Sequence, residues 1–433
     1  MNFISNYFEF EKKGTNLKTE ILGGATTFLT MAYILFVVPG VLSQVGMPKE
    51  SVFAATAIAS AVGTFIIGAI AKFPMVLAPG MGLNAFFAFG VCMGMGIPWQ
   101  STISATLLSG IIFLIISITG LRELVIKAIP NDMKYAVSAG IGLFIAFIGL
   151  KNAGIVVANS ATFVALGNLS DKSVLISLFG LAVISILMVR GVNIAIFLGI
   201  IITVIAGVVS GVVDAPTAIV SMPPSMAPTF GVAIAHLKDV LNPQMMLVVF
   251  TFLFMDFFDT AGTLVAVGSK IGLIREDGTV ENGSKALLAD SVATCIGAIF
   301  GTTNTTSCME SLSGIGLGAK TGFSSVVASG LFILSLFFSP LLSVVTTQVT
   351  APALVIVGSL LCMSFAEIDW SKSEVAIPAF LTIILMPLTY SVGEGIAFGL
   401  LAYVVLMACK GEIKKVHPVM CGLSVLFLVY FMI

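Results

Sequence analysis

The sequence predicts an all-α polytopic membrane protein with fourteen transmembrane segments in a seven-plus-seven inverted repeat. Of the 433 residues, 58% are apolar and 9% are charged, whereas soluble domains carry about 25% charged residues. Apolar runs that can cross a hydrocarbon core about 30 Å thick recur from Ile21 to the C-terminus. Two interrupted spans, marked by Gly82 and Glu310, lie about 228 positions apart, which indicates a repeat.

The remaining composition excludes several classes of protein. The net charge of −1 gives no sign of nucleic-acid binding. The six cysteines are scattered singly and form no metal-binding spacing, so we expect no cofactor. The chain shows no His-Glu metal pair and no soluble catalytic domain, and we do not expect an enzyme. The polar N-terminal lead is too poorly apolar for a cleavable signal, so the first span is expected to stay as an anchor.

Apolar runs bounded by charges or by Pro and Gly define the spans. They lie near 19–43, 51–71, 75–96, 100–120, 134–150, 173–189, 192–213, 244–268, 285–301, 303–318, 322–347, 350–366, 374–391 and 393–409. The apolar tail 419–433 is short for a crossing; it either packs on the bundle or forms a fifteenth span. With the N-terminus inside, sixteen of the twenty basic residues fall on the cytoplasmic side, which supports this map.

The third and tenth spans cannot be uninterrupted helices. Pro79 and Gly80 lie in the middle of the third span, and the Thr-rich segment 302–306 lies at the equivalent place in the tenth. Seven spans per half is an odd number, so the second half enters the membrane inverted. Paired broken helices in an inverted repeat point to the binding site of a transporter, where free backbone N–H groups meet electronegative ligand atoms. The half-helices are expected to begin near 81–84 and 309–311.

Two acids near these breaks are the main functional candidates. A carboxylate near the bilayer centre costs at least about 2.5 kcal/mol, so it is kept there mainly when it binds or moves something. Asp259, in the eighth span, can accept hydrogen bonds from a ligand or carry a proton; the alternative is a purely packing role. Glu310 can do the same, or it can cap its half-helix. Asp256 and Thr263 share the helix face of Asp259.

Other candidate binding residues flank the same breaks. Asn84 either binds ligand or ties off free carbonyl groups, and Met81 and Phe86 either stack on a flat ligand or pack. The complete candidate set is Thr30, Met81, Asn84, Phe86, Asp259, Thr263, Cys308, Met309, Glu310 and Ser311. Since no Lys or Arg falls at the depth of the two acids, H⁺ is the expected coupling ion. Na⁺ remains an alternative, because the Thr-rich segment 302–306 offers oxygen ligands.

Three runs of residues resemble the AzgA-type purine permeases of the nucleobase–cation symporter-2 family. These runs are 78–87 (APGMGLNAFF), 256–263 (DFFDTAGT), and 305–311 (TTSCMES) followed by 318–322 (GAKTG). The resemblance implies the fold of the uracil permease, with short antiparallel strands near 75–80 and 303–308. It also implies a nucleobase held between Asp259 and Glu310, with the backbone N–H groups of 308–311 facing its acceptors. Thr263 stands where the pyrimidine permeases have a His, so a His-based proton relay is not expected.

The resemblance further implies import of adenine, guanine or hypoxanthine by proton symport, through an elevator-type motion of a core domain against a gate domain. A bacterial inner-membrane location, contact with lipid and a homodimer through the gate domain follow from the same likeness. The implied divisions are a cytoplasmic lead 1–18, core halves 19–126 and 244–348, gate halves 127–243 and 349–410, and a C-terminal segment 411–433. The alternatives are a carrier of another nucleobase or of an anion on the same architecture, or a channel.

Overall fold

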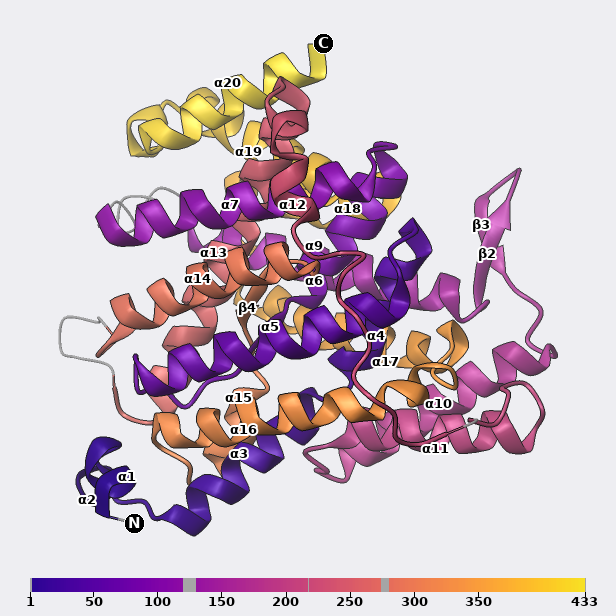
Figure 1. Ribbon diagram of the computed structural model, residues 1–433. Coiled ribbons are helices and arrows are strands. Elements are labelled where there is room, and N and C mark those ends of the chain that lie inside the picture. The colour runs from indigo at the N-terminus through magenta and orange to yellow at the C-terminus, as the bar shows by residue number, and fades with distance from the viewer. Residues whose placement is uncertain (1, 120–129, 217, 274–279, 433) are drawn as a thin grey trace.

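The computed structural model describes residues 2–119, 130–216, 218–273 and 280–432. Within these ranges, ten helices are long and apolar enough to cross a membrane, and three shorter apolar helices accompany them. Each of the fourteen expected spans coincides with a helix or with a strand and its half-helix. The long helices run roughly side by side across the bundle (Figure 1). The helical fold is therefore confirmed, whereas the number of crossings remains a prediction.

The elements of the first half begin with a short lead and end at a pair of helices. They are α1 (Asn2–Tyr7), α2 (Phe10–Lys13), α3 (Leu17–Met31), α4 (Ile34–Leu42), η1 (Ser43–Val45), α5 (Lys49–Ala69), β1 (Leu77–Pro79), α6 (Met81–Ala85), η2 (Phe86–Gly94), α7 (Trp99–Thr119), α9 (Asn131–Asn152), β2 (Val156–Asn159), β3 (Phe163–Leu166), α10 (Lys172–Val189) and α11 (Ala195–Val209).

The second half repeats the interrupted span and adds a C-terminal helix. Its elements are α12 (Val232–Ala235), η3 (Leu237–Val240), α13 (Pro243–Lys270), α14 (Gly283–Phe300), β4 (Thr305–Ser307), α15 (Ser311–Gly316), α16 (Gly322–Ser335), η4 (Leu336–Leu342), α17 (Thr347–Leu361), η5 (Cys362–Glu367), α18 (Ser373–Thr389), α19 (Val392–Cys409), η6 (Ile413–Lys415) and α20 (Pro418–Met432).

Strands β1 and β4 form the centre of the molecule. They pair antiparallel, with Leu77 opposite Ser307 and Pro79 opposite Thr305, and every residue of both strands is buried. β-branched residues in β4 favour an extended backbone. Pro79 ends β1, where its missing N–H does not interrupt the ladder. The pairing confirms the strands expected near 75–80 and 303–308, and it joins the two halves of the chain.

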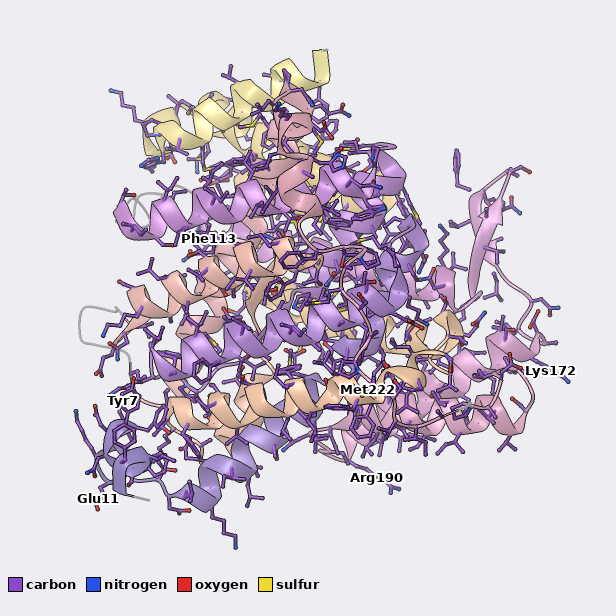
Figure 2. All side chains as sticks on the ribbon, viewed as in Figure 1. Tyr7, Glu11, Phe113, Lys172, Arg190 and Met222 are labelled. Atoms are coloured by element: carbon purple, nitrogen blue, oxygen red, sulfur yellow. The ribbon has the colours of Figure 1, made fainter. Side chains whose placement is uncertain are left out.

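The helices fall into two groups by their packing. Helices α3, α5, α7, α13, α14 and α16 pack mainly on one another, and so do α9, α10, α11, α17, α18 and α19. Contacts between the groups are sparser. Figure 2 shows Glu11, in α2, and Lys172, at the start of α10, at opposite ends of the bundle, which the sequence predicts to lie on opposite sides of the membrane. The C-terminal helix α20 packs along α19, and its Phe427 contacts Phe250 of α13.

Glycines bring helices of the first group close together. A Cβ atom added at Gly314 would lie 2.3 Å from the carbonyl oxygen of Gly23, and one at Gly322 would lie 2.0 Å from that of Gly68. Gly314 and Gly322 therefore allow α15 to pack closely on α3, and α16 on α5.

Candidate functional site

Helix α13 carries Asp259 to the centre of the bundle. The helix begins at Pro243 after Asn242, whose side chain accepts a hydrogen bond from the N–H of Met245 at 2.9 Å. Asp259 is surrounded by protein on most sides, yet it remains accessible to water. Its Oδ2 lies 3.6 Å from the position of a Cβ atom at Gly80, where the first broken span restarts.

Glu310 precedes α15 and approaches Asp259 from the other broken span. The charges of the two carboxylates are close enough to repel each other. Glu310 makes no side-chain capping bond to α15, so helix capping does not explain an acid at this position. Its Oε1 accepts a hydrogen bond from the hydroxyl of Tyr33 at 2.8 Å. The neighbouring Met309 is 49% exposed, and we call the accessible surface of Asp259, Met309 and Glu310 the acid patch.

The hydrogen-bonding capacity of the acid patch is largely unused by the protein. Within the described ranges, no residue donates a hydrogen bond to the carboxylate of Asp259, and the backbone N–H of Met309 has no acceptor. By contrast, the N–H of Cys308 bonds the carbonyl of Val76 at 3.1 Å, and the N–H of Ser311 bonds that of Cys308 at 3.2 Å. Of the four N–H groups expected to face a ligand, these two are therefore committed inside the protein.

Two further acids hold the strand β4 in place. Asp256 is buried, and its Oδ2 accepts hydrogen bonds from Thr294 at 2.9 Å and from Asn304 at 3.0 Å. Asp290 accepts hydrogen bonds from Thr260 at 2.9 Å and from Ser307 at 3.1 Å. Neither acid reaches the acid patch by an accessible surface. Their contacts assign them to fixing α13, α14 and the tenth span together.

The other candidates form the buried surroundings of the acid patch. Asn84 donates a hydrogen bond to the carbonyl of Gly80 at 2.8 Å and accepts one from Thr303 at 2.6 Å. These contacts favour a role in satisfying a free backbone carbonyl group over a role in binding ligand. Phe86 is 1% exposed and packs edge-on against Phe252, with ring centroids 5.0 Å apart. Met81, Thr263, Cys308 and Ser311 are also buried, and Thr30 bonds Ser313 at 3.1 Å. Their assignment as ligand contacts remains a prediction.

Glycines of α13 and α15 near the acid patch have free space beside them. A Cβ atom at Gly262 or at Gly316 would meet nothing within 4 Å, and Leu317 is 50% exposed. Phe89 of η2 packs edge-on against Tyr390, between α18 and α19, with ring centroids 6.2 Å apart.

A surface pocket lies apart from the acids. It has a volume of about 450 Å³ and is lined by Gln44, Val45, Cys92, Met93, Gly96, Ile97, Pro98, Trp99 and Gln100. It contains none of the candidate residues and no ionisable group other than the Cys92 thiol. We therefore place the candidate site at the acid patch, where unused hydrogen-bonding groups and charge coincide.

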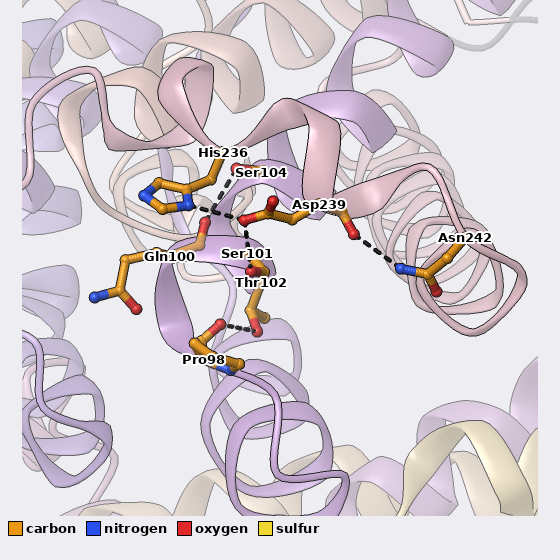
Figure 3. Close-up of polar contacts among 8 residues, drawn as sticks. All are labelled: Pro98, Gln100, Ser101, Thr102, Ser104, His236, Asp239 and Asn242. Carbon is orange, nitrogen blue, oxygen red and sulfur yellow. Dashed lines mark hydrogen bonds and ion pairs between the residues drawn. The ribbon is translucent and has the colours of Figure 1, made fainter.

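A serine, a histidine and an aspartate also meet at the start of α7 (Figure 3). Asp239 Oδ2 contacts His236 Nδ1 at 2.8 Å and accepts a hydrogen bond from Ser101 at 3.2 Å. The serine therefore bonds the acid and not the imidazole, which is not the arrangement of an activated nucleophile. The hydrogen bond with His236 lowers the pKa of Asp239. The stability that this contact contributes is present at neutral pH and is lost as the pH falls through that lowered pKa.

We expect His236→Gln to leave the rate of transport within about twofold of wild type, because His236 and Asp239 are exposed and exposed ion pairs contribute little. Uptake of a radiolabelled substrate into cells, normalised to the amount of protein in the membrane, measures this. Loss of uptake in well-expressed His236→Gln protein would instead assign the cluster to the transport pathway.

The chain is similar to known proteins over nearly its whole length. The model of the Xan_ur_permease family, described as a permease family, matches residues 18–398. The guanine/hypoxanthine permease PbuG of Bacillus subtilis is 52% identical over 437 residues, covering 99% of each chain. The adenine permease AdeQ of Escherichia coli is 37% identical over 424 residues, covering 98% of this chain and 95% of that protein.

Two solved structures share the fold. The transmembrane domain of the cyanobacterial bicarbonate transporter BicA matches with a TM-score of 0.63 at 15% identity, covering 90% of this chain and 97% of that one. The murine anion transporter Slc26a9 matches with a TM-score of 0.65 at 12% identity, covering 94% of this chain and 72% of that one. At these identities, the likeness concerns the fold alone.

Proposed function

Because this chain belongs to the Xan_ur_permease family, we propose that it imports purine nucleobases across the membrane by secondary active transport. Membership in the family makes it a multi-pass membrane transporter and not an enzyme. The relatives named above include permeases for guanine, hypoxanthine and adenine. These three bases form the proposed substrate class.

The acid patch carries this proposal. Two carboxylates with accessible surface stand beside the backbone N–H of Met309, at the meeting point of the two broken spans. A purine ring presents N–H donors and ring-nitrogen acceptors in one plane. Asp259 and Glu310 would accept from the donors, and the N–H of Met309 would donate to an acceptor. Hydrogen bonds to charged groups are the stronger ones, so this set can hold a base firmly.

We propose H⁺ as the coupling ion. The hydrogen bonds and ion pairs of the described residues place no Lys or Arg beside Asp259 or Glu310. A buried carboxyl group with no cation beside it is stable mainly when it carries a proton. One observation favours the Na⁺ alternative: Asp256 Oδ1 and Asn304 Oδ1 are buried without a partner in the described part of the chain. Uptake in sodium medium compared with choline medium separates the two ions.

The proposed transport cycle moves the first group of helices, as the core, against the second group, as the gate. Extensive packing within each group and sparse packing between them support a rigid-body motion. In this conformation, the ring contact between Phe89 and Tyr390 would separate the acid patch from the outer side, and the open space beside Gly262 and Gly316 would lead to the cytoplasm. Opening to the outside would require that ring contact to break.

A thermal-shift screen of the purified protein tests the substrate class. We expect guanine, hypoxanthine or adenine to raise the melting temperature, because a ligand that binds only the folded state stabilises it by about 2.7 kcal/mol at a hundred times its Kd. Uracil, ascorbate, sulfate and bicarbonate serve as controls. A shift with an anion or a pyrimidine, and none with any purine, would contradict the proposal. Accumulation of base that survives a protonophore would indicate a channel or another driving ion.

A further inference from the structure

The break in the first transmembrane helix brings a tyrosine to the acid patch. Helix α3 ends at Met31 and α4 begins at Ile34, so Tyr33 lies in the turn between them. Its side chain is 1% exposed and its hydroxyl donates to Glu310 Oε1 at 2.8 Å. Within the described chain, no other residue donates to the carboxylate of Glu310. Besides the backbone N–H of Glu310 itself, the Tyr33 hydroxyl is thus the one donor to this carboxylate in the described chain.

Close packing makes this contact possible. Gly314 allows α15 to approach α3 so nearly that a Cβ atom there would lie 2.3 Å from Thr27 Oγ1. A second hydrogen bond joins the same segments, from Thr30 Oγ1 to Ser313 Oγ at 3.1 Å. Tyr33 is thus held at a closely packed junction, where its ring is buried. A rigid donor selects one orientation of the Glu310 side chain.

Resting on the proposed function, we infer that Tyr33 is a positioning residue for purine binding. Its hydroxyl fixes Glu310 Oε1 so that Oε2 faces the base and accepts from a ring N–H. Tyr33 does not itself touch the ligand, since it is buried behind Glu310. A flexible carboxylate would lose conformational freedom each time it bound a base, and the tyrosine removes that cost in advance.

The test is a double-mutant cycle with Tyr33→Phe and Glu310→Gln. Tyr33→Phe is expected to raise the Kd for the purine, measured by calorimetry, about tenfold, and to raise KM with a smaller effect on the maximal rate. In the Glu310→Gln background it is expected to add less than about twofold, because Glu310→Gln has already removed the acceptor oxygen that Tyr33 is proposed to orient. Tyr403→Phe is the matched control, since Tyr403 is buried in α19 and its hydroxyl makes no hydrogen bond in the described part of the chain.

The outcomes separate this inference from the proposed function. If Tyr33→Phe raised the Kd by the same factor with and without Glu310→Gln, and also lowered the melting temperature, the role of Tyr33 would be to hold α3 on α15. That result would overturn the inference. A wild-type protein that binds purine, together with a Tyr33→Phe protein of unchanged Kd, would overturn the inference alone. A wild-type protein that binds no purine would overturn the proposed function, and the inference with it.

Discussion

Asp259→Asn is expected to abolish concentrative purine uptake, lowering the initial rate by at least about a hundredfold. Asparagine has the same size, so the packing of α13 should survive. It cannot take up and release a proton, however, and its amide group turns donors toward the N–H groups of the base. The measurement is uptake of labelled base into proteoliposomes with an imposed proton gradient. Exchange of labelled for unlabelled base without a gradient is expected to suffer less, because exchange needs no net proton movement.

Asp290→Asn is the control that shows what the loss of a buried carboxylate outside the acid patch does to the protein. Asp290 accepts hydrogen bonds from Thr260 and Ser307, and it has no accessible surface. Its replacement should lower the free energy of unfolding by about 1–3 kcal/mol, while the protein that remains folded should still couple uptake to the gradient. If Asp259→Asn retained near wild-type uptake and the same pH dependence, the coupling role would belong to another residue.

Glu310→Gln is expected to weaken purine binding by about ten- to a hundredfold. The substitution keeps the length of the side chain and replaces one acceptor oxygen by a donor, which would then face a donor of the base. The bond from the Tyr33 hydroxyl can be retained by the remaining oxygen, so the fold should persist. Isothermal titration calorimetry on the purified protein gives the Kd directly and does not depend on transport.

Glu20→Gln provides the matched control for this second prediction. Glu20 is fully buried in the same group of helices, and its carboxylate accepts from the N–H of Lys320 at 2.8 Å and from that of Ser324 at 3.3 Å. It caps the start of α16 and lies away from the acid patch. Glu20→Gln should therefore lower the melting temperature and leave the Kd of the folded protein unchanged. Unchanged affinity in Glu310→Gln would remove that residue from the site.

The arrangement of the broken spans could be predicted because it follows from backbone chemistry. Pro79 and the run of threonines before Ser307 cannot continue a helix, and their equal depth in the two halves places them together. The two acids stood out for a similar reason, because an ionisable group inside a membrane is costly. Their roles as ligand contacts and proton carriers stay predictions.

The partners of these groups could not be predicted from one sequence. In the sequence, Tyr33 looks like many other aromatic residues of apolar spans. Only its contact with Glu310 in the structure distinguishes it from them. Asn84 left two roles open until the contacts with Gly80 and Thr303 were visible. Glu20 follows the polar N-terminal lead, so nothing in the sequence indicates that its side chain is buried. Each case depends on a contact between distant segments, which local pattern does not encode.

The pairing of β1 with β4 also bears on biogenesis. Leu77 can pair with Ser307 only after all of the intervening chain has been synthesised. Until that happens, the first interrupted span has backbone groups with no partner in lipid, which is costly. The nascent first half must therefore be sheltered, by the translocon or by water, during most of its synthesis. Pairing of β1 with β4 is therefore a late step in the assembly of the protein.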